Sequence, residues 1–355
     1  MTAPFTKDSA YDIQRVTTFR HRISGEAGAR HPPEPGRYHL YAMLGCPWAQ
    51  RVLIVRELKG LQRAISVSFV HHHMVEEEGW AFSAEAPDPL YGLRSLSELY
   101  AMADARFAGR PTVPVLWDKQ RQTIVNNESA ELVRLLGSEF DAVTDNPELD
   151  LYPLPRRARI DDWNDRLQRD VNRGIYAVLF ATTAAERDGA AIRYFAALRQ
   201  LDTHLATQRF LVGEAPTEAD WLLLPSLLRF EWVYRTLAGL QPHSLADHPA
   251  LLGYTRELCQ WPGIAATLDR ALTRTSYFTS MRRFNPSGVV PPYSGVDFAL
   301  PHARGARVVV DLQEKRGAED LRPVPSAAPV GSMHPASARR RKRLRTSRPT
   351  RGRRQ

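Results

Sequence analysis

The fold of this chain is decided by the stretch Tyr38-His-Leu-Tyr-Ala-Met-Leu-Gly-Cys46-Pro47-Trp48-Ala49-Gln50-Arg51, in which an apolar, β-prone run leads through a small turn to a cysteine. An amphipathic run, 52–61, comes next. Proline is tolerated in the first turn of a helix, because the N–H that it lacks would have no partner there. The stretch therefore predicts a strand, a turn and a helix, with Cys46 at the N-terminus of the helix.

Cys46 is the candidate nucleophile of the chain. The partial positive charge at a helix N-terminus favours the reactive thiolate, so we expect a lowered pKa for this thiol. The chain has two cysteines, and no second cysteine stands three residues after Cys46. A lone reactive thiol needs an external thiol partner, for which glutathione is the obvious candidate. The alternative is a buried cysteine that only fills space.

Length and composition limit the class of protein. The 355 residues are enough for two domains with cores of their own. No apolar run approaches the roughly 20 residues of a membrane span, and the N-terminus lacks the pattern of a signal peptide. Two cysteines cannot build a disulfide framework, so we expect a cytoplasmic protein in a reducing compartment and no membrane association.

The basic character of the chain belongs to its C-terminal end. Residues 339–355 hold ten Arg or Lys and no acid, and without them the net charge of +9 becomes −1. Such a segment can neutralise phosphates, but it has no interleaved aromatic residues. We expect no nucleic-acid partner beyond weak electrostatic attraction to this tail. A nucleic-acid-associated protein acting through the tail stays open as the non-enzyme alternative.

The order of predicted elements indicates an α/β, thioredoxin-like N-terminal domain over residues 37–150, preceded by an N-terminal arm over 1–36. A strand, a helix and a second strand imply a parallel pair with a right-handed crossover. A long segment with a short helix near 95–104 follows, and then a hairpin and a helix. In chain order the main predicted elements are 37–42, 47–60, 64–70, 113–117, 122–125 and 128–136.

Helical periodicity dominates from about residue 155. The predicted helices are Arg156–Val171, Ala184–Thr207, Glu218–Tyr234 and Leu251–Gln260, the third capped by Thr217 with Asp220. We therefore predict an all-helical domain over 151–280, a C-terminal loop extension over 281–310 and a disordered Arg-rich tail over 311–355.

Two further motifs are candidates for holding a peptide ligand. A thioredoxin-like sheet requires a proline before its third strand, so we predict a cis Val113–Pro114 bond whose neighbouring backbone groups pair with a peptide such as glutathione. Ser129 and the free N–H groups of the helix behind it suit a carboxylate, and Glu128 suits an ammonium group. The alternative is a capping cluster that only completes the helix end.

Several motifs together resemble the glutathionyl-hydroquinone reductases, the omega-like xi class of glutathione transferases. The resemblance spans roughly residues 10–303. It is carried by Leu44-Gly-Cys-Pro-Trp-Ala49, Gly79-Trp-Ala-Phe82, Pro87-Asp-Pro-Leu-Tyr-Gly92, Thr112-Val-Pro-Val-Leu-Trp-Asp118, Ile124-Val-Asn-Asn-Glu-Ser129, Phe180-Ala-Thr-Thr183 and Asn285-Pro-Ser-Gly-Val-Val-Pro291. It implies a thioredoxin-like domain followed by the all-α C-terminal domain of glutathione transferases, and a homodimer.

The resemblance implies a reduction in which Cys46 takes glutathione from a glutathionyl-hydroquinone and a second glutathione resolves the mixed disulfide. Glutathione is then a co-substrate, and no metal is expected. The implied catalytic residues are Cys46 with Tyr176 and Tyr277 on the hydroquinone side. The implied glutathione contacts are Trp80, Val113, Pro114, Glu128 and Ser129.

Two positions depart from the family pattern. Gln50 stands where the family usually has His, and Phe278 stands at the second tyrosine of a Tyr-Tyr pair, so that Tyr277 is left to supply the hydroxyl. Within enzymes, the alternatives are an omega-like thiol transferase or dehydroascorbate reductase, and a glutathione-dependent ether-cleaving lyase. The run His71-His-His73 does not favour a metal site, because neighbouring strand residues point to opposite faces.

Overall fold

The structure is a computed structural model that describes residues 19–74, 79–241 and 243–305. In this part of the chain the sheet has four strands in the order β2-β1-β3-β4. Their bounds are Tyr38–Ala42 for β1, Ile65–Phe69 for β2, Val115–Asp118 for β3 and Thr123–Asn126 for β4. β1 pairs in parallel with β2 and antiparallel with β3, and β3 and β4 form the predicted hairpin. The thioredoxin-like arrangement is thereby confirmed.

The described part of the N-terminal arm is tied to the edge and the end of this sheet. The N–H of His21 donates to the carbonyl of Val125, and Arg20 pairs with Glu131. Farther along, the buried side chains of His31 and Arg37 both contact Asp118. The arm thus contacts β4, the outer strand of the sheet, and Asp118 at the end of β3.

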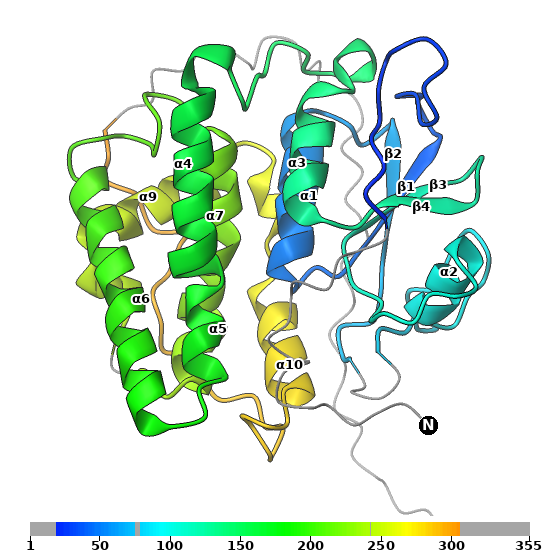
Figure 1. Ribbon diagram of the computed structural model, residues 1–355. Coiled ribbons are helices and arrows are strands. Elements are labelled where there is room, and N and C mark those ends of the chain that lie inside the picture. The colour runs from blue at the N-terminus through cyan, green and yellow to red at the C-terminus, as the bar shows by residue number, and fades with distance from the viewer. Residues whose placement is uncertain (1–18, 75–78, 242, 306–355) are drawn as a thin grey trace, which may run out of the picture. The chain divides into compact units, whose positions relative to one another are not determined.

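Helices lie on both sides of the sheet. Figure 1 shows α1 (Pro47–Leu58) and α3 (Ser129–Ser138) between the sheet and the other helices, whereas α2 (Leu96–Ala103) lies on the far side from them. All five residues of β1 are buried, as expected for a central strand with both faces covered.

The second half of the described chain is helical, as predicted. Its helices are α4 (Arg157–Leu167), α5 (Gly174–Leu179), α6 (Ala184–Leu205), α7 (Glu218–Arg229), α8 (Arg235–Leu237), α9 (Pro249–Cys259) and α10 (Arg270–Ser280). The predicted cap of α7 is present, with Thr217 and Asp220 bonded reciprocally. π-Helical turns over Gln168–Asn172 and Phe230–Tyr234 continue α4 and α7. Short 3₁₀ turns lie at Asp141–Val143, Leu154–Arg156, Leu245–Asp247 and Ile264–Thr267.

Two helices escaped the sequence pattern. α5 has six residues, too few for a periodic signal. α10 buries Thr273, Arg274 and Ser276 beside Phe278, so its inner face is mostly polar. The all-helical region is therefore right, but the inventory of its helices was incomplete.

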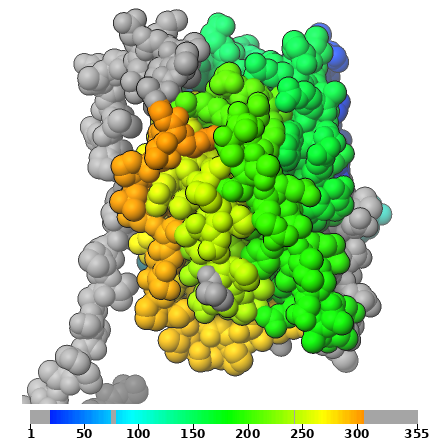
Figure 2. Space-filling model, turned by 90° about the vertical axis from the view of Figure 1, so that its left-hand side faces the viewer, coloured from blue at the N-terminus to red at the C-terminus, as the bar shows by residue number. Residues whose placement is uncertain are grey.

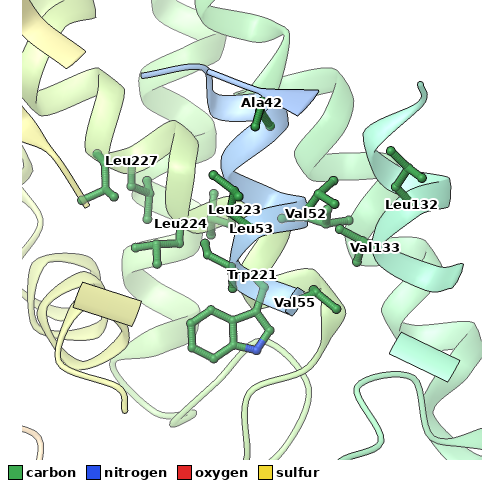
Figure 3. Packing of buried hydrophobic residues seen from close by; sticks show 14 of the residues in the cluster. Ala42, Val52, Leu53, Val55, Leu132, Val133, Trp221, Leu223, Leu224 and Leu227 are labelled. Atoms are coloured by element: carbon green, nitrogen blue, oxygen red, sulfur yellow. The ribbon is translucent and has the colours of Figure 1, made fainter. Parts of the chain in front are cut away.

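The two halves share one apolar core around α1. Figure 3 shows Val52, Leu53 and Val55 of α1 between the side chains of α3 and those of α7. The sequence predicted an amphipathic helix here, and that prediction was wrong, because α1 is buried on nearly every side. The reason is that the helical half covers the face of α1 that the sheet leaves free.

The C-terminal extension runs back over the helical half. Residues 281–305 contain no helix or strand, and Figure 2 shows the end of this segment, in orange, beside the helices. The ring of Phe298 packs against Trp232, and Arg304 pairs with the buried Glu257. The predicted parts at 1–18, 306–310 and 311–355 lie outside the described residues. Among the described helices, none has the length and apolar character to cross a membrane.

Candidate active site

Cys46 lies where the sequence predicted, directly before the first turn of α1. It is the N-cap residue with extended backbone, and Pro47 opens the helix. Its N–H donates to the carbonyl of Met43 at 2.9 Å. Its half-buried Sγ lies 3.8 Å from the carbonyl oxygen of Val113. The Val113–Pro114 bond is cis, as predicted, so the thiol and the cis-proline turn face each other.

The net pKa shift of the Cys46 thiol is opposite to the sequence-based expectation. Burial raises its pKa and is the largest influence on it. The N–H groups of Ala49 and Trp48 and the guanidiniums of Arg229 and Arg51 act in the other direction. The helix N-terminus thus favours the thiolate as expected, but desolvation outweighs it.

Gly45 allows the Cys46 loop to approach α10 closely. A Cβ on this residue would lie 2.9 Å from Cε of Met43 and 3.3 Å from Cα of Thr273. A contact with backbone at that distance leaves little room for adjustment. The loop before the thiol is therefore packed directly against a helix of the other half.

Gln50 bridges the two halves. It is fully buried, and its side-chain amide donates to the carbonyl of Thr267 at 2.9 Å. Its carbonyl oxygen accepts a hydrogen bond from Arg229. The amide nitrogen and the amide oxygen of Gln50 are thus both hydrogen-bonded to the helical half.

Arg229, the last residue of α7, reaches the Cys46 loop from the helical half. Its Nε donates to the carbonyl of Gly45 at 3.1 Å, and its Nη2 donates to the carbonyl of Leu44 at 3.2 Å. Sequence reasoning missed Arg229, because no local motif marks it.

Three tyrosines from the helical half form a chain of hydroxyls. The OH of Tyr234 lies 3.0 Å from the OH of Tyr176 and 3.0 Å from the OH of Tyr277. Burial raises the pKa of all three phenols, so they stay protonated at neutral pH and can donate. We call Tyr176, Tyr234 and Tyr277 the tyrosine cluster.

Tyr234 was not among the predicted site residues. It is the last residue of the π-helical turn after α7, and such turns are frequent at functional sites. The wider turn changes which face of the helix its residues occupy, so helical periodicity in the sequence could not show where Tyr234 lies.

The tyrosine at position 277, and not the phenylalanine at 278, belongs to this cluster. Phe278 is only 2% exposed and packs in the core. Neighbouring helical residues point in different directions, which separates the two side chains. The departure from the family pattern at Phe278 therefore removes no hydroxyl from the cluster.

The cluster adjoins the Cys46 helix through aromatic contact. The rings of Trp48 and Tyr176 are nearly parallel, with centroids 6.4 Å apart and planes at 20°. Electrostatic interaction with Cys46 acts on both Tyr176 and Tyr277. The structure therefore brings the three predicted catalytic residues into one neighbourhood.

The other predicted glutathione contacts lie at the start of α3 and in the segment before α2. Glu128 is the N-cap of α3, but its carboxylate makes no capping bond, and its N–H donates to Asn126 at 2.7 Å. Ser129 is buried at the first helical position. The Glu128 carboxylate therefore does not cap the helix, and the N-terminus of α3 is suited to an anion.

Trp80 is half-buried, and its carbonyl accepts the N–H of Leu96 at 2.9 Å. Among the described contacts, none joins Trp80, Glu128 or Ser129 directly to Cys46. Over residues 19–74, 79–241 and 243–305, no group of three His, Cys, Asp or Glu side chains could hold a metal ion.

Comparisons with known proteins agree with this geometry. The model of the glutathione S-transferase N-terminal domain matches residues 45–139, and that of the C-terminal domain matches residues 184–257. The glutathionyl-hydroquinone reductase YqjG of Escherichia coli (strain K12) is 40% identical, over 85% of this chain and 95% of that protein. The reductase PcpF of Sphingobium chlorophenolicum is 39% identical, over 80% of this chain and 93% of that protein.

Solved structures give the same result. The xi-class glutathione transferase of Natrialba magadii matches with a TM-score of 0.80 and 38% identity, over 86% of this chain and 93% of that one. The glutathione-bound structure of YqjG from Escherichia coli K-12 matches with a TM-score of 0.77 and 39% identity, over 81% of this chain and 96% of that one. A helix-capping thiol beside a cis-proline, in this fold and at this similarity, places the chain in the family of the glutathionyl-hydroquinone reductases, the xi-class glutathione transferases.

Proposed function

We propose that this protein reduces glutathionyl-hydroquinones to hydroquinones, with glutathione as co-substrate and Cys46 as the nucleophile. The observation that carries the proposal is the meeting of a single helix-capping thiol with the tyrosine cluster. A thiol alone suits many exchange reactions. A thiol beside several phenol donors suits a substrate that has both a sulfur to attack and an aromatic oxygen to hold.

In the first step the Cys46 thiolate attacks the sulfur of the glutathionyl group. The new S–S bond forms as the bond between that sulfur and the ring carbon breaks. The electron pair of the broken bond goes to the ring, which takes up a proton and leaves as the hydroquinone. Cys46 is left in a mixed disulfide with glutathione.

In the second step the thiolate of another glutathione attacks the glutathionyl sulfur of the mixed disulfide. Oxidised glutathione leaves, and the Cys46 thiolate is restored. The two electrons that reduce the ring carbon therefore come from two thiols that end as one disulfide. A single cysteine is enough for this cycle, since the external thiol acts as the resolving group.

The tyrosine cluster serves the ring in this proposal. Protonated phenols donate hydrogen bonds to a hydroquinone oxygen on which negative charge develops as the C–S bond breaks. Tyr176 and Tyr277 are the two ends of the cluster, and Tyr234 between them holds both hydroxyls in place. One of these phenols also supplies the proton that the ring carbon takes up.

Glutathione binds, in this proposal, along the thioredoxin-like half. The backbone of Val113 before Pro114 pairs with the peptide, Ser129 and the start of α3 take the γ-glutamyl carboxylate, and Glu128 takes the ammonium group. Trp80 covers the peptide from the segment before α2. The first position of α3 and the carboxylate of its N-cap, which makes no capping bond, support this assignment. We further propose a cytoplasmic homodimer.

The test is turnover of a synthetic glutathionyl-hydroquinone with glutathione, with the released hydroquinone measured by chromatography. The same enzyme is assayed on a small glutathione mixed disulfide and on dehydroascorbate. A much higher kcat/KM for the hydroquinone conjugate supports the proposal. A preference for the small disulfide or for dehydroascorbate would overturn it in favour of an omega-like thiol transferase.

A further inference from the structure

Two buried guanidiniums lie beside the thiol, and only one of them, Arg51, feels a nearby carboxylate, that of Glu128. Arg229 is 0% exposed and Arg51 is 2% exposed. In the part of the chain that the structure describes, neither forms an ion pair with Asp or Glu. By contrast, the buried Arg37 and Arg56 each pair with a carboxylate. An unpaired buried charge is costly. Glu128 acts on Arg51, whereas the thiol and the phenols act on Arg229, so Arg229 is the cation that calls for a compensating anion.

The hydrogen bonds of Arg229 leave its charge unbalanced. Its three acceptors are the carbonyls of Leu44 and Gly45 and the amide oxygen of Gln50, all of them neutral. These acceptors hold the guanidinium against the loop that ends in Cys46. They fix its position but supply no negative charge.

The groups around Arg229 that can become negative are the thiol and the phenols. Cys46 on α1, Tyr176 on α5, Tyr234 after α7 and Tyr277 on α10 all interact electrostatically with it. Two other charged groups lie near the thiol: Arg51 on α1, a second cation, and the carboxylate of Glu128 before α3, which acts on Arg51. Of the thiol and the phenols, the thiol ionises most readily in water, since phenols have an ordinary pKa near 10 and thiols one near 8.5.

We propose that Arg229 is a positioning residue that holds the Leu44–Cys46 loop and supplies the counter-charge of the Cys46 thiolate from the helical half. The charge of the thiolate then completes an ion pair across the two halves of the molecule. This inference rests on the Cys46 chemistry proposed above, but not on the identity of the substrate.

Arg51 contributes charge without holding the loop. Its Nε donates to the carbonyl of Leu222, and its guanidinium lies 4.4 Å from the centre of the Trp48 ring. Burial lowers its pKa to about 10, which leaves it charged at neutral pH. It therefore adds to the positive potential at Cys46, whereas the contacts to the loop backbone belong to Arg229.

Arg229 can stabilise the negative charge both before and after the bond between sulfur and the ring carbon breaks. Before bond breaking, the negative charge is on Cys46. As the aryl group leaves, charge moves toward an oxygen beside the tyrosine cluster, which also faces Arg229. A fixed cation between the two positions needs no rearrangement while the charge moves, which is the condition for electrostatic preorganisation.

The test is the pH dependence of Cys46 alkylation by iodoacetamide in the intact protein, with the site of modification mapped by mass spectrometry. In Arg229→Met the midpoint of the alkylation profile is expected to rise by about 1 unit. Arg229→Lys keeps the charge and is expected to remain within about half a unit of the wild type. Arg56→Met, which removes another buried arginine, on α1 of the thioredoxin-like half, is the control and is expected to leave the midpoint unchanged.

Activity gives a second readout. The kcat/KM of Arg229→Met near pH 7 is expected to fall about 10-fold and to recover as the pH rises, because more thiolate then forms without the cation. A folded Arg229→Met protein with an unshifted alkylation profile would overturn the inference, even if the hydroquinone conjugate is turned over. A shifted profile without such turnover would overturn only the proposed substrate.

A second variant covers the case in which Arg229→Met does not fold. Gln50→Glu keeps Arg229 and places a carboxylate against its guanidinium, where Gln50 now bonds it. This carboxylate competes for the cation and repels the thiolate, so the alkylation midpoint is again expected to rise. An unchanged midpoint in folded Gln50→Glu protein also contradicts the inference.

Discussion

The candidate site has two sides, one with the Cys46 thiol and one with the tyrosine cluster. We call them the sulfur side and the phenol side, and they are built in different ways. The sulfur side comes from the thioredoxin-like half, where Cys46 and Val113 each stand beside a strand or a helix end. The phenol side comes from the helical half, where the tyrosine cluster joins residues that are 58 and 43 positions apart in the chain. The difference shows that the Cys46 thiol is placed by one local motif, whereas the position of the tyrosine cluster depends on the packing of several helices.

The largest effect is expected on the sulfur side, from Cys46→Ala. Without the thiol no mixed disulfide forms, so turnover of the glutathionyl-hydroquinone should fall by roughly 1000-fold or more. Hydroquinone release measures it. In the wild type, intact mass after exposure to oxidised glutathione should show one adduct, and peptide mapping should assign it to Cys46.

Cys259→Ala is the matched control for that loss. Cys259 is buried in the helical half, and burial strongly raises the pKa of its thiol. The control should keep kcat/KM within about threefold. An adduct found only at Cys259, or reductase activity retained in Cys46→Ala, would rule out Cys46 as the nucleophile.

The next effect is expected on the phenol side. Tyr176→Phe removes one hydroxyl and little volume, and it should slow the reductive step by roughly 10–1000-fold. Glutathionylation of Cys46 by oxidised glutathione should barely change, because that reaction involves no aromatic leaving group. The two rates are measured by chromatography and by intact mass.

Equal losses in both assays would instead mean that Tyr176 supports the fold or the glutathione site. Tyr234→Phe sharpens the test, since it removes the hydroxyl that bonds both ends of the cluster. If the cluster acts as a unit, Tyr234→Phe and Tyr176→Phe should show the same selective loss. An unaffected reductive rate in both variants would turn attention to Tyr277 alone.

Acid should destabilise the protein through a histidine of the sheet. His39 on β1 is buried between the hydroxyls of Ser66 and Ser68, and burial lowers its pKa to about 4. Its ordinary pKa is about 6.5, so the folded protein loses stability as the pH falls from 6.5 to 4, where only the unfolded chain takes up the proton. The loss from this residue is about 3 kcal/mol. The tyrosines of the helical half stay protonated over this whole range.

Urea unfolding at pH 7 and pH 4 measures this loss, with His39→Gln as the comparison. The variant should show a drop in unfolding free energy between the two pH values that is smaller than that of the wild type by about 3 kcal/mol. An equal drop in both proteins would show that His39 does not cause the acid sensitivity.

The smallest effect is expected from the basic tail, which falls outside the stretch of sequence, roughly 10–303, that resembles the family. Truncation near residue 312 should leave kcat/KM within about threefold, or about 0.7 kcal/mol in transition-state terms. A tenfold loss would show that the tail serves catalysis. DNA binding that survives Cys46→Ala and vanishes on deletion of 339–355 would favour the nucleic-acid alternative.

Sequence reasoning predicted the parts of the molecule that short stretches determine. Pro47 after Cys46 marks a helix start, and apolar, β-prone runs mark the strands, so the thioredoxin-like half and the place of the Cys46 thiol in it could be predicted. The position of Tyr234 depends on a π-helical turn, which has no marker in the hydrophobic pattern. The contacts of Arg229 with Gly45 and Gln50 join residues 184 and 179 positions apart, which no local motif encodes.

The direction of the Cys46 pKa shift was missed for the same reason. A helix N-terminus can be recognised from Pro47 alone, but burial of the thiol depends on how the helical half packs against α1. Desolvation is the larger of the two influences. A motif can therefore identify a nucleophile without indicating how readily it ionises.

The bond between Gln50 and Arg229 has a consequence for building chimaeric proteins from this family. The side chain of Gln50 lies in the N-terminal half, and its partner Arg229 lies in the C-terminal half. Positions 50 and 229 must therefore be exchanged together. A fusion near residue 150 that takes Arg229 from one parent and an apolar residue at position 50 from another leaves a buried guanidinium with one acceptor fewer. Compatibility of such hybrids should therefore follow this residue pair more closely than overall sequence identity.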